Sequence, residues 1–576
     1  MKLIKKLLKA YRGTKHKDRI FKQAMLVLRK EGLGGLKRAI NGAYDNDVKQ
    51  GMELYQFQQS EGFSSDFVER SVLFIVLAED VNVDCEETLM SIGQLQNINK
   101  REVVLAPRGY QCAQQDKVIE FDGDWTVHLK NLLAFETCDY VFFIKNGDVV
   151  APNMAYEFWG NVSQGCLPLL YSDECTGKGE GKVYKLKAKY SLYEWLIQGK
   201  MGRAVAFPRE LILPLFEKAV TDTTDNLIFS FAMLAAFKAQ VKHVEKVLLL
   251  RQDATVITDA RVKFINECLR DIHCELNAIN SGNQVALIGM AAKRKYSIIL
   301  NDTGALLEAL DDIVKKTQYV ETEIIAVTSN ADNYKAAQAL YAGDEKIRIF
   351  QAEGSFSEKN NIGAGHANGD ILVFYDSANR VSDEAWLYQL DKMFAFEYIA
   401  AISPKIIRPE NTIKYAGLLS GGFGFTPVLF NGDENVCVEG WNDPAFRSRE
   451  VSILSATCIA VRKEIFVKIG GFDSQNTPQK FSNAVLSYEI ARLGYACFYC
   501  ADVTLVSYSP NWYDSFYDQA EKGVSLHLLK KYAAELSVDL TFTDTMKRQY
   551  LRGVPQDFKI YGRKSSEKKK HLNGES

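Results

Sequence analysis

Long apolar segments are missing from this sequence of 576 residues. The longest apolar runs, such as residues 72–78, fall far short of the ~18 residues that a membrane-spanning helix needs. The first 40 residues also lack the continuous apolar stretch of a secretory signal peptide. We therefore expect no spanning helix and a location in the reducing cytoplasm.

Cysteine frameworks and common nucleotide-binding fingerprints are missing as well. The eleven cysteines are scattered, and the C-x-x-C pair of Cys497 and Cys500 has no second pair at zinc spacing. This pair is better explained as part of a buried strand over residues 496–506. No GxGxxG, P-loop or Ser-His-Asp signature stands in a convincing context, so none of these common sites is expected.

A large net charge is also absent, but the charge is unevenly distributed along the chain. The overall formal charge is −2. Residues 1–40 carry a net charge of +11 and residues 547–570 carry +7, which leaves −20 for the rest. An acidic body would repel a phosphate backbone, and no aromatic residues alternate with the basic ones, so we expect no nucleic-acid partner.

The basic N-terminal segment has the pattern of two cationic amphipathic helices, with apolar residues at helical spacing. One interpretation is docking on an anionic membrane surface, to which each nearby basic residue contributes about 1 kcal/mol. A helix packed on the body and a solvated basic arm are the alternatives, because each helix is short. Docking would make this a peripheral protein at the inner face of the cell membrane.

An internal repeat is the most informative feature that is present. The composition, 47 % apolar and 25 % charged, is that of a globular chain, and the length suggests two to four domains. Apolar runs predict strands of the first copy at residues 71–77, 102–106, 118–121 and 140–144, with helices at 86–95 and 129–136. The second copy has strands at 296–300, 323–327, 347–350 and 371–375, with helices at 306–314 and 358–368.

Apolar strands that alternate with helices predict an α/β fold with a mostly parallel sheet covered on both faces. Ligands of such sheets bind at the carboxyl ends of the strands. The polar tetrapeptides 145–148 and 376–379 follow the fourth strand of each copy, so both are candidate sites. The expected organisation is a basic helical arm at 1–60, domains at 70–255 and 295–515, a helical linker at 256–294, and a C-terminal helix with a basic tail at 516–576.

Four stretches of the second copy carry a family resemblance. They are residues 356–363 with 367–370, residues 414–417 with 421–422, residues 456–466, and residues 470–473. They resemble family 2 glycosyltransferases of the GT-A fold, especially tandem enzymes that build bacterial O-antigen or rhamnose-rich polysaccharides. The first copy resembles the family more faintly, best at residues 171–174. The resemblance spans about residues 70–250 and 295–510 and implies two tandem GT-A-like domains.

The resemblance implies inverting transfer of a sugar from a nucleotide-sugar donor. A D-x-D motif holds a divalent cation, Mn²⁺ or Mg²⁺, which neutralises the diphosphate of the donor. A carboxylate takes the proton from the acceptor hydroxyl. The implied partners are a nucleotide sugar, a lipid-linked or polysaccharide acceptor, and other glycosyltransferases.

By this resemblance the second copy keeps only part of such a site. Its D-x-D position reads Asp376-Ser377-Ala378, so Asp376 is the remaining candidate for binding the donor and the metal. The catalytic-base position falls at Asn483, and an amide has no useful basicity near neutral pH. Asn330, which replaces an acidic pair of the family, and Asn361 are further donor-binding candidates.

The first copy departs from the family differently. Its D-x-D position reads Lys145-Asn146-Gly147-Asp148. Lys145 would replace the metal as a point charge on the diphosphate, and Asp148 would keep a donor-binding or metal-ligating role. The base position retains a carboxylate, Asp225, which is the candidate catalytic residue. Asp173 and Glu174 are candidates for donor binding.

Ordinary structural roles stay open for each of these carboxylates. Asp148 fits a turn or a helix cap, Asp225 fits a helix N-cap, and Asp376 fits an Asx turn. Asp173 and Glu174 fit a pair of loop carboxylates.

Two functions therefore stand side by side. In the first, the protein is an active glycosyltransferase of bacterial surface polysaccharide or O-antigen synthesis, and the first copy is the working domain. In the second, both copies keep the fold without the chemistry, and the protein serves as a glycan-binding or scaffold subunit of a glycan assembly complex. The resemblance favours the first function, and the incomplete acidic motifs favour the second.

Overall fold

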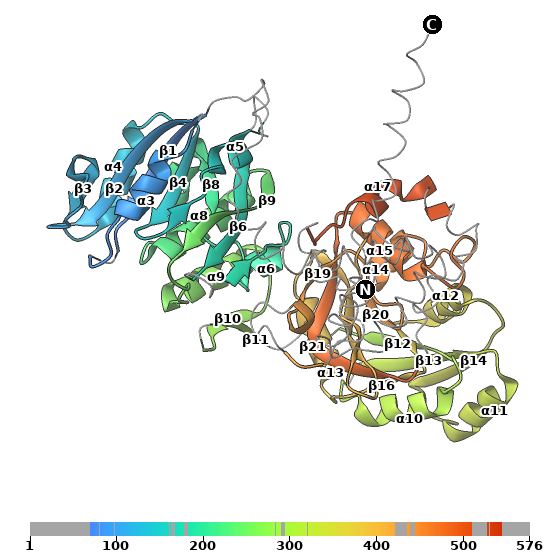
Figure 1. Ribbon diagram of the computed structural model, residues 1–576. Coiled ribbons are helices and arrows are strands. Elements are labelled where there is room, and N and C mark those ends of the chain that lie inside the picture. Colours follow the sequence, from blue (N-terminus) through green and yellow to red (C-terminus); the bar gives the residue numbers. More distant parts are fainter. Residues whose placement is uncertain are drawn as a thin grey trace, which may run out of the picture. The chain divides into compact units, whose positions relative to one another are not determined.

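The computed structural model describes residues 70–543, apart from residues 80, 97, 161, 163–166, 178–182, 283, 290–293, 320, 421–434, 438–443, 510–526 and 529. These residues form two compact units, the first mainly from residues up to 267 and the second mainly from residues 287–542 (Figure 1). The basic N-terminal arm and the basic C-terminal tail lie outside the described residues, so membrane docking stays a prediction. No helix in the described part of the chain is both long enough and apolar enough to cross a membrane.

The first unit is built on a mixed nine-stranded sheet. Its strands are β1 (Ser71–Leu77), β2 (Asn99–Pro107), β3 (Val118–Phe121), β4 (Tyr140–Lys145), β5 (Val149–Val150), β6 (Leu169–Thr176), β7 (Val183–Lys185), β8 (Val205–Pro208) and β9 (Val241–Arg251). They lie in the order β3-β2-β1-β4-β8-β6-β9-β5, with β7 beside β6. The first four strands are parallel, and β8 runs antiparallel between β4 and β6.

Helices cover this sheet and close its core. They are α3 (Glu86–Gly93), α4 (Trp125–Phe135), α5 (Met154–Trp159), α6 (Leu192–Leu196), α7 (Arg209–Ile212), α8 (Thr224–Ala236) and α9 (Asp259–Asp271). Five of the six residues of β4 are buried, as expected for a central parallel strand. Phe74 packs against Phe142 and Trp159 at ring-centroid distances of 5.8 and 6.5 Å. Burial of each such aromatic side chain contributes about 2–3 kcal/mol to stability.

The second unit is built on a ten-stranded sheet. Its strands are β12 (Tyr296–Asn301), β13 (Thr322–Thr328), β14 (Ile347–Gln351), β15 (Ile371–Asp376), β16 (Asn379–Val381), β17 (Ile399–Ile407), β18 (Ile413–Tyr415), β19 (Arg449–Val451), β20 (Cys458–Arg462) and β21 (Ala496–Ser507). They lie in the order β14-β13-β12-β15-β20-β17-β21-β16, with β18 beside β17 and β19 beside β21.

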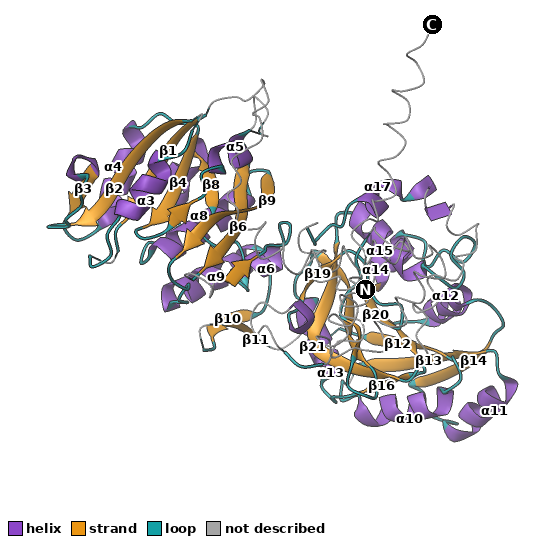
Figure 2. Cartoon of the chain, in the orientation of Figure 1, coloured by secondary structure: helices purple, strands orange, loops and turns teal. Residues whose placement is uncertain are grey.

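The helices of the second unit lie on both faces of its sheet. They are α10 (Leu306–Lys316), α11 (Ala331–Leu340), α12 (Phe356–His366), α13 (Trp386–Met393), α14 (Lys463–Lys468), α15 (Ser482–Arg492) and α17 (Ala533–Ser537). Figure 2 shows α10 and α11 together along one side of β13 and β14, with α12 on the other side. Both faces are therefore covered, as the continuous apolar strands predict.

The two sheets have the same strand order, position by position. Each strand of the first sheet has a counterpart of the same direction in the second, and β19 is the one addition among the described strands. The strand register also shows which residues are equivalent. Leu77 of β1 pairs with Lys145 of β4, and Asn301 of β12 pairs with Asp376 of β15. Lys145 and Asp376 are therefore equivalent. The internal repeat and the predicted fold class, two tandem α/β domains with mostly parallel sheets, are confirmed.

Two smaller expectations have mixed outcomes. Cys497 and Cys500 lie buried within β21 as predicted. The segment expected to be a helical linker contains the helix α9, which packs on α8 through Phe264 and Phe229 at a centroid distance of 5.9 Å. It also contains a hairpin of β10 (Asn277–Asn280) and β11 (Val285–Ile288), which the sequence did not reveal because these strands are short and partly polar.

Candidate functional site

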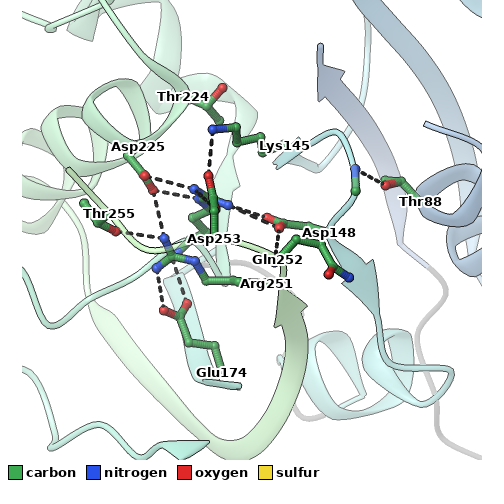
Figure 3. A network of polar contacts seen from close by, with 12 residues as sticks. Thr88, Lys145, Asp148, Glu174, Thr224, Asp225, Arg251, Gln252, Asp253 and Thr255 are labelled. Carbon is green, nitrogen blue, oxygen red and sulfur yellow. Dashed lines mark hydrogen bonds and ion pairs between the residues drawn. The ribbon is translucent and has the colours of Figure 1, made fainter. Parts of the chain in front are cut away.

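Four of the predicted site residues of the first domain meet at the carboxyl end of its sheet (Figure 3). Lys145 ends β4, and Asp148 follows in the next turn. Glu174 lies on β6, and Asp225 lies in the first turn of α8. The fold thus joins residues that are up to 80 positions apart into one ion-pair cluster.

The centre of this cluster is Arg203, whose side chain is fully buried. Its Nη1 donates to both oxygens of Asp148 at 3.2 and 2.9 Å. Its Nε and Nη2 donate to the two oxygens of Asp225 at 2.7 and 2.9 Å. Nη2 also lies 2.6 Å from Oδ1 of Asp253. One guanidinium therefore contacts three carboxylates, and its planar arrangement of N–H donors suits such multiple contacts.

A second buried guanidinium, that of Arg251 at the end of β9, supports the inner side of the cluster. Its Nη1 lies 2.9 Å from Oε1 of Glu174, and its Nη2 lies 3.5 Å from Oδ1 of Asp225. Lys187 Nζ lies 3.3 Å from the other oxygen of Glu174. Burial alone would raise the pKa of Glu174, but Lys187 and Arg251 hold it well below its ordinary value.

A glycine is required beside this inner pair. Gly202 has a φ of +68°, and a side chain there would overlap the carboxylate of Glu174. The same turn presents the backbone N–H of Arg203 to Glu174 Oε2 at 2.9 Å. Gly202 therefore allows Arg203 to enter the cluster.

The outer side of the cluster is accessible to solvent and consists of three side chains. Asp253 is 42 % exposed, and its Oδ2 lies 2.8 Å from Lys145 Nζ. Lys145 Nζ also lies 3.0 Å from Oε2 of Glu79. Burial would lower the pKa of Lys145, but these two carboxylates raise it above its ordinary value. The two oxygens of Asp253 thus contact two different cations, Lys145 and Arg203, at the open edge of the cluster.

The pKa values of Asp148 and Asp225, both bound to Arg203, are shifted in opposite directions. Burial raises the pKa of Asp148 to about 6, although Arg203 and Arg251 oppose this. Burial also acts on Asp225, but there the hydrogen bonds and charge of Arg203 prevail and the pKa is lowered. Asp225 is therefore ionised at neutral pH, with its side chain 12 % exposed towards solvent.

The helix-cap interpretation of these residues is wrong. The N-cap of α8 is Thr223, whose side chain accepts from Asn226 N. The N-cap of α5 is Asn153, so Asp148 caps neither helix. The turn interpretation of Asp148 is confirmed, because its backbone N–H donates to Lys145 O at 3.0 Å and closes the turn after β4.

The loop interpretation of Asp173 and Glu174 is also wrong, because both lie buried on β6. Asp173 Oδ1 accepts from the backbone of Lys187 at 2.8 Å and contacts His243 Nε2 at 3.0 Å. Its described contacts therefore do not include Arg203, Arg251 or Lys145. Its donor-binding role stays a prediction.

Among the residues of the second domain that the structure describes, no comparable buried ion pair lies at the equivalent place. Asp376 Oδ1 accepts from Thr303 Oγ1 at 2.5 Å and from Ala378 N at 2.8 Å. The second bond closes the predicted Asx turn, so that interpretation is confirmed. Extension of the strand register places Thr457 where the first domain has Arg203, and its carbonyl accepts from Asp376 N at 3.0 Å. Burial raises the pKa of Asp376.

Asn330, Asn361 and Asn483 make structural contacts in the second domain. Asn330 caps α11 by accepting from two backbone N–H groups. Asn361 exchanges hydrogen bonds with both backbone groups of Phe472, at 2.8 and 3.0 Å. Asn483 donates to Leu454 O at 2.6 Å. The donor-binding roles predicted for Asn330 and Asn361 stay predictions, and each must coexist with these contacts.

The expected divalent cation does not fit at Asp148. Both oxygens of the Asp148 carboxylate already accept hydrogen bonds from the Arg203 guanidinium. The positive charge of Arg203 leaves little negative charge at Asp148 to attract a cation. Within the described ranges, neither Asp148 nor Asp376 belongs to a cluster of three His, Cys, Asp or Glu ligands close enough to share one ion. A metal role for Asp376 would rest on this carboxylate and neighbouring hydroxyls, because Ala378 offers no ligand.

Five residues of the cluster were not predicted from the sequence. Arg251 ends an apolar strand, and the other four lie in loops: Glu79, Lys187, Arg203 and Asp253. Only the contacts that the fold creates with oppositely charged residues reveal them. A buried arginine at a strand end, as in the run Leu248-Leu249-Leu250-Arg251, is the single signal that the sequence offered.

The comparisons with known proteins find likenesses to parts of this chain. Part of this chain resembles an O-antigen biosynthesis protein. That protein, RfbC of Myxococcus xanthus, is 27 % identical over 188 residues, which is 31 % of this chain and 15 % of the relative. An uncharacterized protein, y4gI of Sinorhizobium fredii, is 23 % identical over 221 residues, or 36 % of this chain and 24 % of the relative. The chain thus spans a quarter or less of either relative, and no protein-family model matches it.

Solved glycosyltransferase structures overlap the chain in part. GalNAc-T7 with UDP, GalNAc and Mn²⁺ covers 42 % of this chain and 50 % of its own, with 14 % identity and a TM-score of 0.34. The mannosyltransferase PcManGT of Pyrobaculum calidifontis with GDP-Man and Mn²⁺ covers 39 % and 60 %, with 16 % identity and a TM-score of 0.29. The repeated strand order shows two tandem α/β domains, and their likeness to the GT-A fold stays a resemblance.

Proposed function

We propose that this protein is an inverting glycosyltransferase of bacterial surface polysaccharide synthesis whose first domain performs the transfer. In this proposal Lys145 and Arg203 bind the diphosphate of the nucleotide sugar in place of a divalent cation. Asp225 accepts the proton of the acceptor hydroxyl. The acceptor is a lipid-linked or polysaccharide chain at the inner face of the cell membrane, and the basic N-terminal arm holds the protein there.

The observation that carries the proposal is the position of Asp253. Its carboxylate lies between Lys145 Nζ and Arg203 Nη2, at 2.8 and 2.6 Å, on the exposed side of the cluster. A carboxylate that bridges two cations at the carboxyl end of a parallel sheet occupies the kind of place where such folds bind anions. A diphosphate carries more charge than a carboxylate and would displace Asp253 from both cations.

The position of Asp225 supports the second half of the proposal. It shares Arg203 with Asp253, so its carboxylate lies within the same cluster. Arg203 keeps it ionised and fixed in orientation, which a general base needs before the acceptor arrives. The acceptor oxygen would form a bond to the anomeric carbon while the bond to the nucleoside diphosphate breaks. The proton of the acceptor hydroxyl would pass to Asp225.

One observation favours the second candidate function, a non-catalytic glycan-binding or scaffold subunit. The base positions of both domains are engaged: Asp225 in two hydrogen bonds with Arg203, and Asn483 in a hydrogen bond to Leu454 O. If these contacts persist in the presence of a donor, neither Asp225 nor Asn483 can accept the acceptor proton. A wild-type protein that binds nucleotide but transfers no sugar would support this second function.

An Asp253→Asn variant tests the diphosphate site with a prediction of sign. We expect UDP or GDP to bind about five- to thirty-fold more tightly in the presence of EDTA, since removing a competing charged partner is worth about 1–2 kcal/mol. Isothermal titration calorimetry on the full chain measures the affinity. Asp122→Asn is the matched control, because it removes the same charge from an exposed pair with Arg108 and should leave the affinity unchanged. Weaker binding in Asp253→Asn would show instead that Asp253 holds the donor or a cation.

A further inference from the structure

Two cysteines of the first domain face one another beside the candidate site. Cys85 precedes α3, and Cys112 lies in the segment after β2, 27 residues further along the chain. Their Sγ atoms are 2.9 Å apart. Cys85 is fully buried, whereas Cys112 is half-buried and lies within reach of solvent. Both are free thiols in the structure.

We propose that Cys85 and Cys112 form a reversible disulfide that is a redox modification site of the first domain. The proposal does not depend on the proposed transferase activity. Two thiols at this distance need only a small approach to form a bond of about 2.05 Å. The scattered spacing of the eleven cysteines gave no indication of this pair.

A metal site explains the pair less well. Two thiolates on one tetrahedral zinc ion, each about 2.3 Å from the metal, lie about 3.8 Å apart. The Sγ–Sγ distance of 2.9 Å is much shorter than this. The third group nearby, Asp84, is exposed and accepts from the backbone N–H of Glu86 at 2.9 Å. Disulfide formation is therefore the chemistry that the geometry favours.

The position of the pair links it to the turn that carries Asp148. The helix that begins after Cys85 accepts from Gly147 N through Thr88 Oγ1 at 3.0 Å, and from Val150 N through Ser91 Oγ at 3.2 Å. These two bonds flank Asp148 on either side. A crosslink at the start of α3 would therefore restrain the helix whose hydroxyl groups hold this turn.

A second set of contacts joins the cysteine segments to the same turn. The carbonyl of Val83 accepts from Asn146 Nδ2 at 2.7 Å and from Tyr110 OH at 2.9 Å. Tyr110 lies two residues before Cys112, and Val83 lies two residues before Cys85. Both cysteine segments and the turn thus meet at one carbonyl. Oxidation of the pair should reduce the motion of the 145–150 turn.

The reaction balances with a low-molecular-weight disulfide such as oxidised glutathione as the oxidant. The thiolate of Cys112, the more accessible sulfur, attacks the glutathione disulfide, breaks its S–S bond and releases one glutathione. Cys85 then loses its proton, attacks the Cys112 sulfur and releases the second glutathione. The two cysteines are oxidised, the glutathione disulfide is reduced to two thiols, and the two cysteine protons end on those thiols.

Peptide mapping of the full chain tests the proposal. After incubation with oxidised glutathione we expect a crosslinked peptide that joins Cys85 to Cys112 and disappears with dithiothreitol. Hydrogen exchange of the 145–150 segment should slow several-fold on oxidation. Cys112→Ser should abolish both effects, and it is the safer variant for folding because Cys112 is half-buried whereas Cys85 is fully buried. Cys138→Ser, which removes another half-buried thiol of the same domain, should abolish neither.

Three results would overturn the proposal. The first is the absence of the Cys85–Cys112 crosslink at every ratio of oxidised to reduced glutathione, in wild-type protein whose hydrogen exchange shows that it is still folded. The second is a crosslink that forms without any change in hydrogen exchange of the 145–150 segment, which would remove the connection to the site. An equal yield of crosslinks from Cys112 to Cys138 would likewise show that the pairing is accidental.

Discussion

An Asp225→Asn variant should transfer sugar about 10²- to 10⁴-fold more slowly than the wild-type protein, with nucleotide affinity changed far less. The amide keeps the shape of the side chain but cannot accept the acceptor proton. Asp225 is the base candidate because it is ionised, oriented by Arg203 and partly exposed. Release of nucleotide from a panel of UDP-, GDP- and dTDP-sugars, with polysaccharide acceptors, measures the rate.

Asp222→Asn is the matched control for this experiment. Asp222 lies just before α8, as Asp225 lies just inside it, but Asp222 bonds Asn226 Nδ2 at 2.7 Å and Thr258 Oγ1 at 2.8 Å. These contacts lie outside the ion pairs of Arg203, so the control should keep most of the transfer rate. An Asp225→Asn variant as active as the wild type would remove Asp225 from the mechanism.

An Arg203→Met variant should lower the free energy of unfolding of the first domain by about 3–5 kcal/mol. The substitution leaves Asp148, which is only 1 % exposed, without its cation. The negative charges of Asp148, Asp225 and Asp253 would then repel one another without the positive charge of Arg203 between them. Hydrogen exchange read by mass spectrometry separates the two domains, because peptides from β6 and α8 report the first and peptides from β12 and β15 the second. Only the first set should lose protection.

A double variant shows whether the loss comes from the unpaired charge. Asp148→Asn added to Arg203→Met should restore part of the lost stability, because it removes the buried carboxylate that lost its partner. Strictly additive losses would show that the two residues are not coupled. A loss below about 1 kcal/mol in Arg203→Met alone would show that water replaces the guanidinium at little cost.

The first four strands of each domain could be predicted closely, because each is an apolar run of strand length bounded by polar turns, whereas most of the strands that follow them, β5 to β9 and β16 to β20, were not predicted. The predicted strands at 71–77 and 118–121 coincide with β1 and β3, and the others differ at their ends by a few residues. The repeat was visible for the same reason, since burial on both faces leaves the same signature in both copies. The hairpin β10–β11 was missed because its short, half-exposed strands leave no such signature.

The site could be predicted only in part. Strand ends marked Lys145 and Asp148, and the family resemblance marked Asp225, and the fold brings them together. Their partners Arg203 and Asp253 could not be predicted, because long-range ion pairs leave no local pattern. The resemblance to a metal-dependent family also drew attention to carboxylates, whereas the cluster of the first domain is organised around a guanidinium.

Nucleotide titration in the absence of metal decides whether Lys145 and Arg203 bind the donor in place of a divalent cation. The full chain is titrated calorimetrically with UDP and GDP in the presence of EDTA, beside Lys145→Gln and Asp376→Asn variants. We expect one of the nucleotides to bind the wild-type protein in EDTA. It should bind Lys145→Gln at least ten-fold more weakly, and it should bind Asp376→Asn as tightly as the wild type. Binding that requires Mn²⁺, is lost in Asp376→Asn and is unaffected in Lys145→Gln would contradict this expectation and place the donor site in the second domain.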